Sequence, residues 1–525
     1  MFKASYKTIW RIENSRVTED NSIMIYKALQ KLIDYGIKNN IITDYDVYVV
    51  RNKLMEALSL TEWQESKCSF SDEDIDSILK PIIDYACENG IISDTVGSRD
   101  LFDTKLMGLL TPMPREVISE FNKNYAISPE YATEMYYNFS KKLNYVRAGR
   151  IANDLKWTYD CEYGTLDITI NCSKPEKDPR DIAQAGSMRS SSYPQCQLCP
   201  ENAGFAGHVN HPARQNLRPV PINVCGEKWF MQYSPYGYYN EHCIIFNEKH
   251  IPMVINNIVF DKLFDVIDFL PHYFVGSNAD LPIVGGSILS HEHFQGGNYE
   301  FAMAKSPVET EFEILEFSSV SAGIVKWPMS VIRLSSVSRD QLVRVASKIL
   351  DTWRSYSDES AGIYAETNGI PHNTITPIAR KRNSFYECDL VLRNNITTEE
   401  RPLGVFHPKP SLHHIKKENI GLIEVMGLAI LPARLAEELE IIRDSIFLGK
   451  DELRKHSELS EHFEWIESLI DKYPDLSKEN ADYIIKQEIG AVFEEILRDA
   501  GVFKRDDNGR AAFIRFVNRV KCDTA

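Results

Sequence analysis

The sequence has no long hydrophobic run. Its longest apolar stretches, such as residues 425–431, are far shorter than the roughly 18 residues expected of a membrane-spanning helix. The N-terminus, MFKASYKTIWRIENS, has neither an apolar core of about seven residues nor a small-residue cleavage site. We therefore expect a cytoplasmic protein with no secretory signal and no membrane partner.

Cysteine is also scarce, with ten residues among 525. Eight of the ten are widely scattered, which is typical of reduced thiols in a cytosolic protein rather than of a disulfide framework. Only Cys196 and Cys199 are spaced for shared chemistry.

A long basic tract is absent as well. The chain has 59 Lys+Arg against 75 Asp+Glu, for a net charge of −16, and such an acidic surface repels nucleic-acid backbones. We expect no nucleic-acid partner. A small phosphorylated ligand held by two or three arginines is compatible with this charge.

The pattern of apolar residues predicts an α+β protein with helical ends around a β-containing middle. Residues 1–150 have helical periodicity and a weak internal repeat, in which residues 33–35 and 83–85 both read Ile-Asp-Tyr. The repeat indicates two related helical hairpins, and chance or a shared turn chemistry would explain it nearly as well as duplication. Helix is expected again at 341–353 and from Asn419 to the C-terminus, except for a breaker at Pro432 and a polar loop near Pro474. Short β-branched or aromatic runs predict strands, and residues 174–179 read as a linker. The predicted strands cover residues 167–170, 229–233, 242–246, 324–329, 373–378 and 389–393.

The motif GGSILSHEHFQGG, residues 285–297, carries the strongest chemical signal. In an extended strand His291, His293 and Gln295 project to one face, and Glu292 points to the other. The zincin pattern H-E-x-x-H is absent because Gln295 stands where the second histidine would be. A zinc deaminase would need its cysteine pair after the H-x-E run, whereas here the pair comes first. A structural histidine in a turn is the alternative reading of His293.

The pair Cys196 and Cys199 forms a good half-site for zinc, because two thiolates separated by two residues can bind one tetrahedral ion. No second such pair exists, so histidines must complete the site, and His250 and His291 are candidates. A redox pair would open a helix after a strand, whereas this pair precedes a turn-like stretch. Two buried thiols without a metal are the alternative.

Several longer motifs, together with HEHFQ, resemble those of the galactose-1-phosphate uridylyltransferases, a family of the histidine-triad superfamily. The resemblance is to the longer, Gram-positive-type branch of that family. These motifs are SYPQCQLCPENAGFAGHVNHPARQNLRPVPI, YYNEHCIIFNEKHIPM, HNTITPIARKRNSFYECDLVLRNN and LHHIKKENIGLIEVMGLAILPARL. The resemblance implies two histidine-triad-like antiparallel sheet halves with an added helical N-terminal region. The expected division is 1–150 for the helical region, 151–310 and 311–445 for the two halves, and 446–525 for a helical C-terminal segment.

The resemblance implies transfer of UMP from UDP-glucose to galactose 1-phosphate by a ping-pong route. His293 would be the nucleophile that forms a uridylyl-histidine, and imidazole is nucleophilic at neutral pH without a metal. Gln295 would hydrogen-bond the phosphoryl oxygens, and its lack of acid-base function suits transfer rather than hydrolysis. Glycines 285, 286, 296 and 297 would let backbone amides approach the phosphates.

The family further implies a structural zinc and no organic cofactor. By motif the zinc ligands are Cys196, Cys199, His250 and His291, with His242 as the alternative to His250. Glu292 is expected to orient a backbone group or a ring nitrogen. A homodimer is also implied.

Other candidate substrate contacts come from the quoted motifs, with solvated surface arginine as the alternative for each arginine. They are Ser287, Arg214, Asn216, Arg218, Arg380 and Arg382. Two rival functions stay open at this point. One is a nucleotide hydrolase or phosphorylase of the same superfamily, and the other is a non-enzymatic zinc-stabilised interaction protein.

Overall fold

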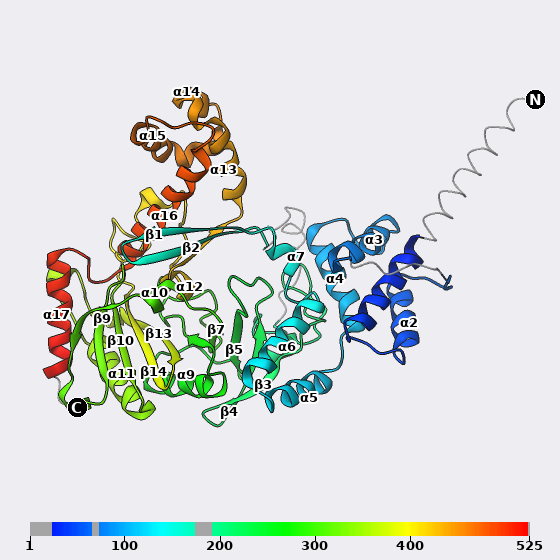
Figure 1. The fold of residues 1–525 in the computed structure, drawn as a ribbon, viewed down its shortest axis with the longest axis horizontal. Coiled ribbons are helices and arrows are strands. Elements are labelled where there is room, and N and C mark those ends of the chain that lie inside the picture. The colour runs from blue at the N-terminus through cyan, green and yellow to red at the C-terminus, as the bar shows by residue number, and fades with distance from the viewer. Residues whose placement is uncertain (1–23, 66–72, 174–191, 523–525) are drawn as a thin grey trace, which may run out of the picture. The chain divides into compact units, whose positions relative to one another are not determined.

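The computed structural model describes residues 24–65, 73–173 and 192–522 (Figure 1). The expected linker at 174–179 lies outside the described residues. The chain divides into two compact units. One comprises residues 1–152, 175–221 and 232–236, and the other 153–174, 222–231 and 237–525. The four-part division expected from the sequence stays a prediction.

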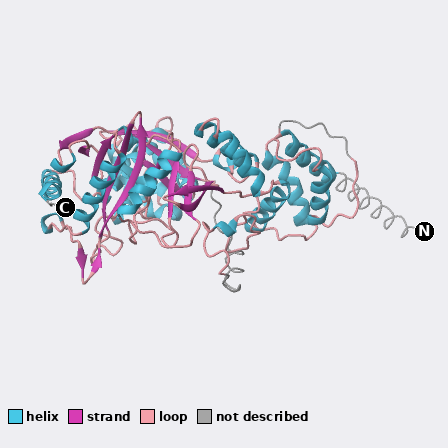
Figure 2. Cartoon of the chain, turned by 90° about the horizontal axis from the view of Figure 1, so that it is seen from below, coloured by secondary structure: helices cyan, strands magenta, loops and turns pink. Residues whose placement is uncertain are grey.

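The first unit is built from helices, which confirms the predicted helical N-terminal region (Figure 2). Capping residues fix where several of them begin. Asp74 and Ser128 each accept a hydrogen bond from a backbone N–H three residues on, and Pro129 occupies the first helical position. The helices are residues 24–38, α2 Val47–Ala57, α3 Ile75–Glu88, α4 Val96–Leu110, α5 Pro114–Tyr125, α6 Pro129–Lys142, α7 Ala148–Ile151 and the 3-10 turn η1 Pro200–Asn202.

The internal repeat has the same turn in both copies. Asn39 donates from its side chain to the carbonyl of Tyr35 at 3.0 Å, and Asn89 donates to that of Tyr85 at 2.8 Å. The backbone N–H groups of Ile41 and Ile91 also close equivalent bonds, to the carbonyls of residues 36 and 86. The repeated sequence therefore encodes one helix-ending turn that is used twice.

A ten-stranded sheet carries the candidate site, in the order β3-β4-β5-β7-β6-β13-β14-β10-β9-β8. The pairing of β6 with β13 joins two five-stranded halves, and α9 Asn257–Phe269 and α11 Arg339–Arg354 pack on its strands. This confirms the α+β class with antiparallel sheets. The strands are β3 Val220–Val224, β4 Glu227–Tyr233, β5 Cys243–Asn247, β6 Phe274–Gly276, β7 His293–Gly297, β8 Val308–Phe312, β9 Ser321–Val325, β10 Val331–Ser336, β13 Asn373–Arg382 and β14 Phe385–Asn394.

A smaller sheet has the order β1-β2-β15, with β1 Leu155–Cys161, β2 Gly164–Asn171 and β15 Leu428–Pro432. The prediction of helix from Asn419 onward is wrong at β15, which pairs in parallel with β2. This strand is an apolar run buried against helix α16, and apolar runs of that length suit either kind of element. A two-stranded ribbon, β11 Glu366–Thr367 with β12 Ile370–Pro371, completes the β structure among the described residues.

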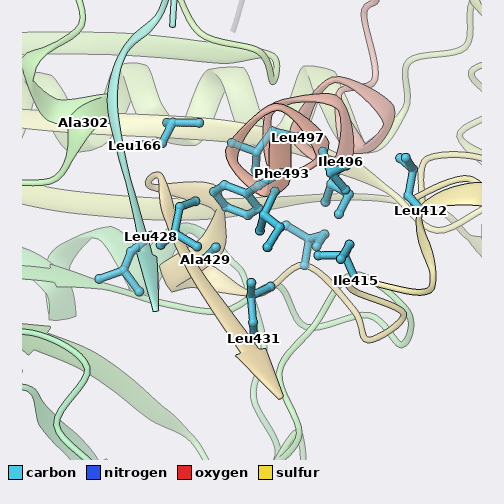
Figure 3. Packing of buried hydrophobic residues seen from close by; sticks show 14 of the residues in the cluster. Leu166, Ala302, Leu412, Ile415, Leu428, Ala429, Leu431, Phe493, Ile496 and Leu497 are labelled. Carbon is cyan, nitrogen blue, oxygen red and sulfur yellow. The ribbon is translucent and has the colours of Figure 1, made fainter. Parts of the chain in front are cut away.

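The C-terminal helices of the second unit, apart from α17 Asp507–Cys522, pack around a shared apolar core, and α17 contacts α11. Phe493, Ile496 and Leu497 of α16 face Leu428 and Leu431 of β15 in that core (Figure 3). The helices are α10 Ala302–Lys305, α12 Leu422–Val425, α13 Arg434–Ser445, α14 Lys450–Leu453, α15 Phe463–Lys472, α16 Ala481–Ala500 and α17 Asp507–Cys522.

Two expectations from composition can be compared with the described part of the chain. The nine cysteines it contains are free, in agreement with the expected reduced thiols, but only Cys199, Cys243 and Cys388 are buried. None of its helices combines the length and the apolar character needed to cross a membrane.

Candidate functional site

The HEHFQ run enters strand β7 at His293. In the antiparallel pairing with β5, His293 lies opposite Phe246 and Gln295 lies opposite Ile244. His293 and Gln295 therefore share one face of the sheet, as the two-residue period predicts. Phe294 points to the other face and stacks on Trp229, with ring centroids 5.0 Å apart.

His293 is held in one tautomer. Its Nδ1 lies 2.7 Å from the carbonyl oxygen of His291, and because a carbonyl can only accept, Nδ1 carries the proton. The other ring nitrogen, Nε2, therefore carries the lone pair. Burial lowers the pKa of His293 to about 4, so the ring is neutral at neutral pH. A neutral, oriented imidazole is what a nucleophilic histidine needs.

The glycines that follow Gln295 are required by protein packing. A Cβ on Gly296 would lie 2.8 Å from the carbonyl oxygen of Phe274, and one on Gly297 would lie 2.8 Å from that of Glu241. Before the histidines, a Cβ on Gly285 would lie 2.6 Å from the carbonyl oxygen of Ala279. The expected approach to phosphates is therefore not needed to explain these glycines.

Four side chains bring metal-ligating atoms together. One ligand atom from each of Cys196, Cys199, His250 and His291 lies within 4.8 Å of all the others. The two sulfur atoms are 3.6 Å apart, close to the roughly 3.8 Å expected for two thiolates on one tetrahedral zinc. The alternative ligand His242 is not in this group.

The chemistry of this cluster fits a cation. Burial is the largest effect that raises the pKa of the Cys199 thiol, to about 12, and the neighbouring Cys196 adds to it. A bound metal would reverse that shift, because it stabilises thiolates. His291 donates from Nε2 to the carbonyl of Asn247 at 2.8 Å, which leaves Nδ1 as the ligating atom.

Residues that the sequence did not single out hold the cysteine turn. The side-chain amide of Asn202 donates to the carbonyls of Cys196 and Cys199, at 2.8 and 2.9 Å. His211 in turn contacts the amide oxygen of Asn202 at 2.6 Å. An asparagine three residues after Cys199 is visible in the sequence, but its burial and its contacts with the cysteine turn are not.

Glu292 faces away from His293, as strand parity predicts. Its carboxylate accepts from Lys262 of α9 at 2.6 Å and from the side-chain amide of Asn247 at 2.9 Å. The backbone carbonyl of Asn247 is the acceptor for His291. Glu292 and His291 therefore contact different groups of the same Asn247, and the expected orienting role of Glu292 stays a prediction.

Comparison with known proteins identifies the family. The family model described as galactose-1-phosphate uridyl transferase, N-terminal domain, matches residues 42–252, and the model of the C-terminal domain matches residues 266–461. This chain belongs to the galactose-1-phosphate uridyl transferase family.

Similar relatives named galactose-1-phosphate uridylyltransferase cover nearly the whole chain. The protein from Clostridium acetobutylicum is 52% identical over 94% of this chain and 100% of its own length. The protein from Bacillus subtilis is 48% identical over 94% and 98%. Among solved structures, yeast Ap4A phosphorylase Apa2 is similar at 12% identity and a TM-score of 0.34, over 63% of this chain and 91% of that one.

In this uridyl transferase family member, several of the candidate substrate contacts form hydrogen bonds or ion pairs with other residues of the protein. Asn216 donates to the carbonyl of Leu143 at 3.0 Å, and buried Arg218 donates to the carbonyls of Pro112, Gln215 and Leu217. Burial lowers the pKa of Arg218. These contacts support a structural role for both residues, and their role in substrate binding stays a prediction.

Arg380 lies in a buried ionic network with Glu387 and Asp389, and Arg333 pairs with the same Asp389 at 2.7 Å. Burial tends to lower the pKa of Arg380, but the two carboxylates outweigh it and raise that pKa. Arg382 is half-exposed beside Glu300.

The two remaining candidates are less enclosed. Ser287 is exposed, and Arg214 is partly buried with its guanidinium over the ring of Tyr145. The substrate contacts proposed for Arg380, Arg382, Ser287 and Arg214 stay predictions.

Proposed function

We propose that the protein transfers the uridylyl group of UDP-glucose to galactose 1-phosphate through a covalent intermediate on His293. Glucose 1-phosphate and UDP-galactose are the products. The names of relatives about 50% identical over most of the chain support the reaction. The fixed tautomer of His293, with a free lone pair on Nε2, is the observation that supports the covalent route.

In the first half-reaction the lone pair of His293 Nε2 forms a bond to the α-phosphorus. The phosphoanhydride P–O bond breaks, and its electron pair leaves with glucose 1-phosphate. Positive charge then develops on the imidazole ring. The hydrogen bond from Nδ1–H to the carbonyl of His291 strengthens as that charge grows, so it stabilises the intermediate.

In the second half-reaction a phosphate oxygen of galactose 1-phosphate attacks the same phosphorus. The N–P bond breaks and Nε2 regains its lone pair, so no proton is gained or lost overall. Gln295 lies two residues along the same face and can donate an amide N–H to the phosphoryl oxygens in both steps. A carboxamide cannot serve as an acid or a base, which favours transfer over hydrolysis.

Cys196, Cys199, His250 and His291 would hold a structural zinc. The two-sulfur, two-nitrogen donor set and the sulfur separation support this metal. When bound, the ion would fix His291, whose carbonyl accepts from the nucleophile. A homodimer and a cytoplasmic location, which the family resemblance implies, stay predictions.

The covalent route can be tested with UDP-glucose labelled at the α-phosphate. Native protein should acquire label that is labile in acid and stable in base, and His293→Ala should acquire none. His372→Ala removes another buried histidine and serves as the matched control, which should label normally. Normal labelling of His293→Ala would show that the nucleophile is another residue.

A further inference from the structure

His242 lies immediately before β5, on the face of the sheet that carries His293 and Gln295. Because Cys243 pairs with Gly296 and Ile244 with Gln295, His242 is the diagonal neighbour of Gln295. Its Nε2 lies 3.1 Å from the side-chain oxygen of Gln295. That oxygen can only accept, so His242 donates.

The ring of His242 is held firmly. It is 3% exposed and packs against Tyr239 and Tyr238, with ring centroids 4.5 and 5.4 Å away. Its backbone N–H donates to the carbonyl of Tyr239, and Tyr239 donates from its hydroxyl to the carbonyl of Gly296 in β7. The donor that Gln295 meets is therefore fixed relative to the strand of the nucleophile.

We infer that His242 is a positioning residue for the uridylyl transfer. By donating to the oxygen of Gln295, it turns the NH₂ end of that carboxamide outward as the free donor. The inference rests on the proposed function, in which Gln295 donates to the phosphoryl oxygens.

Gln295 needs such a positioning residue because a carboxamide has two orientations of nearly equal shape. In the flipped orientation a carbonyl oxygen would face the anionic phosphoryl group and repel it. While the ring proton of His242 is on Nε2, it penalises the flip, because the flipped amide would present N–H to N–H, and flipping then also requires the proton to move to Nδ1. His242 thus makes Gln295 a donor before substrate arrives, which is electrostatic preorganisation.

The test compares His242→Phe with His242→Gln in the full-length protein. Phenylalanine keeps an aromatic ring between the tyrosines and removes the donor, whereas glutamine retains an N–H donor. We expect His242→Phe to lower kcat on the order of 10- to 100-fold, because a misplaced group costs about that much. The KM for UDP-glucose should change less, and His242→Gln should recover most of kcat.

If His242 acts by positioning Gln295, the effects of substituting the two residues should not add, whereas a general structural role of His242 would give additive effects. In single-turnover labelling, Gln295→Ala with His242→Phe should be no slower than Gln295→Ala alone. The matched control is His372→Phe, because His372 also contacts an amide oxygen, that of Asn395 at 2.8 Å, away from β7. It should leave kcat unchanged.

Two results would overturn the inference: wild-type kcat in His242→Phe, or effects of the two substitutions that multiply. If wild-type protein turns over but never carries label, the covalent route fails instead. The ratio of kcat between wild type and His242→Phe still reports on His242 in that case.

Discussion

Glu292→Gln should destabilise the strands around the nucleophile by about 3 kcal/mol. The side chains of Glu292 and Lys262 are 11% and 12% exposed, and their charged atoms are 2.6 Å apart. Removing one partner of a buried pair costs about 3–5 kcal/mol, because the other charge stays buried. Glu227, 3.5 Å from Lys262 and 39% exposed, offsets part of that cost, which places the estimate at the lower end.

The assay is hydrogen exchange of the β5 and β7 amides in the metal-loaded protein, because exchange reports the local opening free energy. A loss of about 3 kcal/mol corresponds to exchange on the order of 100-fold faster. The glutamine oxygen can accept from Asn247 or from Lys262 but not from both, so the substitution removes the charge and one of the two hydrogen bonds. Combining it with Lys262→Met removes both charges and should restore exchange to within about tenfold of wild type.

Glu248→Gln is the matched control. Glu248 pairs with Lys228 at 2.7 Å, but these side chains are 44% and 55% exposed, so the loss should stay below about 1 kcal/mol. If Glu292→Gln exchanges no faster than Glu248→Gln, the buried pair does not stabilise this region as argued.

Three further predictions concern the metal ligands, the buried arginines and the end of β7. Cys199→Ser should lower the zinc content of purified protein below about half an equivalent, as measured by elemental analysis. Cys388 is a buried thiol outside the cluster, so Cys388→Ser should keep the zinc. Equal zinc in the two variants would contradict the ligand assignment. Asp389→Asn should lower stability by about 3–5 kcal/mol in thermal unfolding, because Arg333 and Arg380 lose their shared buried carboxylate, and an unchanged Tm would contradict this. Gly297→Ala should lower both stability and kcat, because its Cβ would lie 2.8 Å from the carbonyl oxygen of Glu241. Full activity at wild-type stability would show that the backbone can shift to accommodate the Cβ.

Local patterns predicted the arrangement of side chains on strand β7 well. The two-residue period places His293 and Gln295 together whatever the rest of the fold does, and the register with β5 agrees. The cysteine spacing and two histidines likewise predicted the four-residue cluster. The strand inference needed only residue type and short-range geometry, whereas the choice of His250 and His291 also rested on the family resemblance.

What the sequence did not predict depends on contacts between distant segments. The link between His242 and Gln295 follows from the β5–β7 register, which no spacing reveals. The enclosure of Arg218 and Arg380 by carbonyls or carboxylates could not be predicted, because burial cannot be read from one sequence. Strand β15 was missed because a short apolar run suits a strand or a buried helix equally.

The most direct test of the central claim is to locate the uridylyl group on the protein. Protein incubated with UDP-glucose alone and digested at alkaline pH should yield one peptide carrying UMP, with the modification on His293 by mass spectrometry. Adding galactose 1-phosphate before digestion should remove it. UMP on a different residue, or none on a protein that still turns over, would contradict the account.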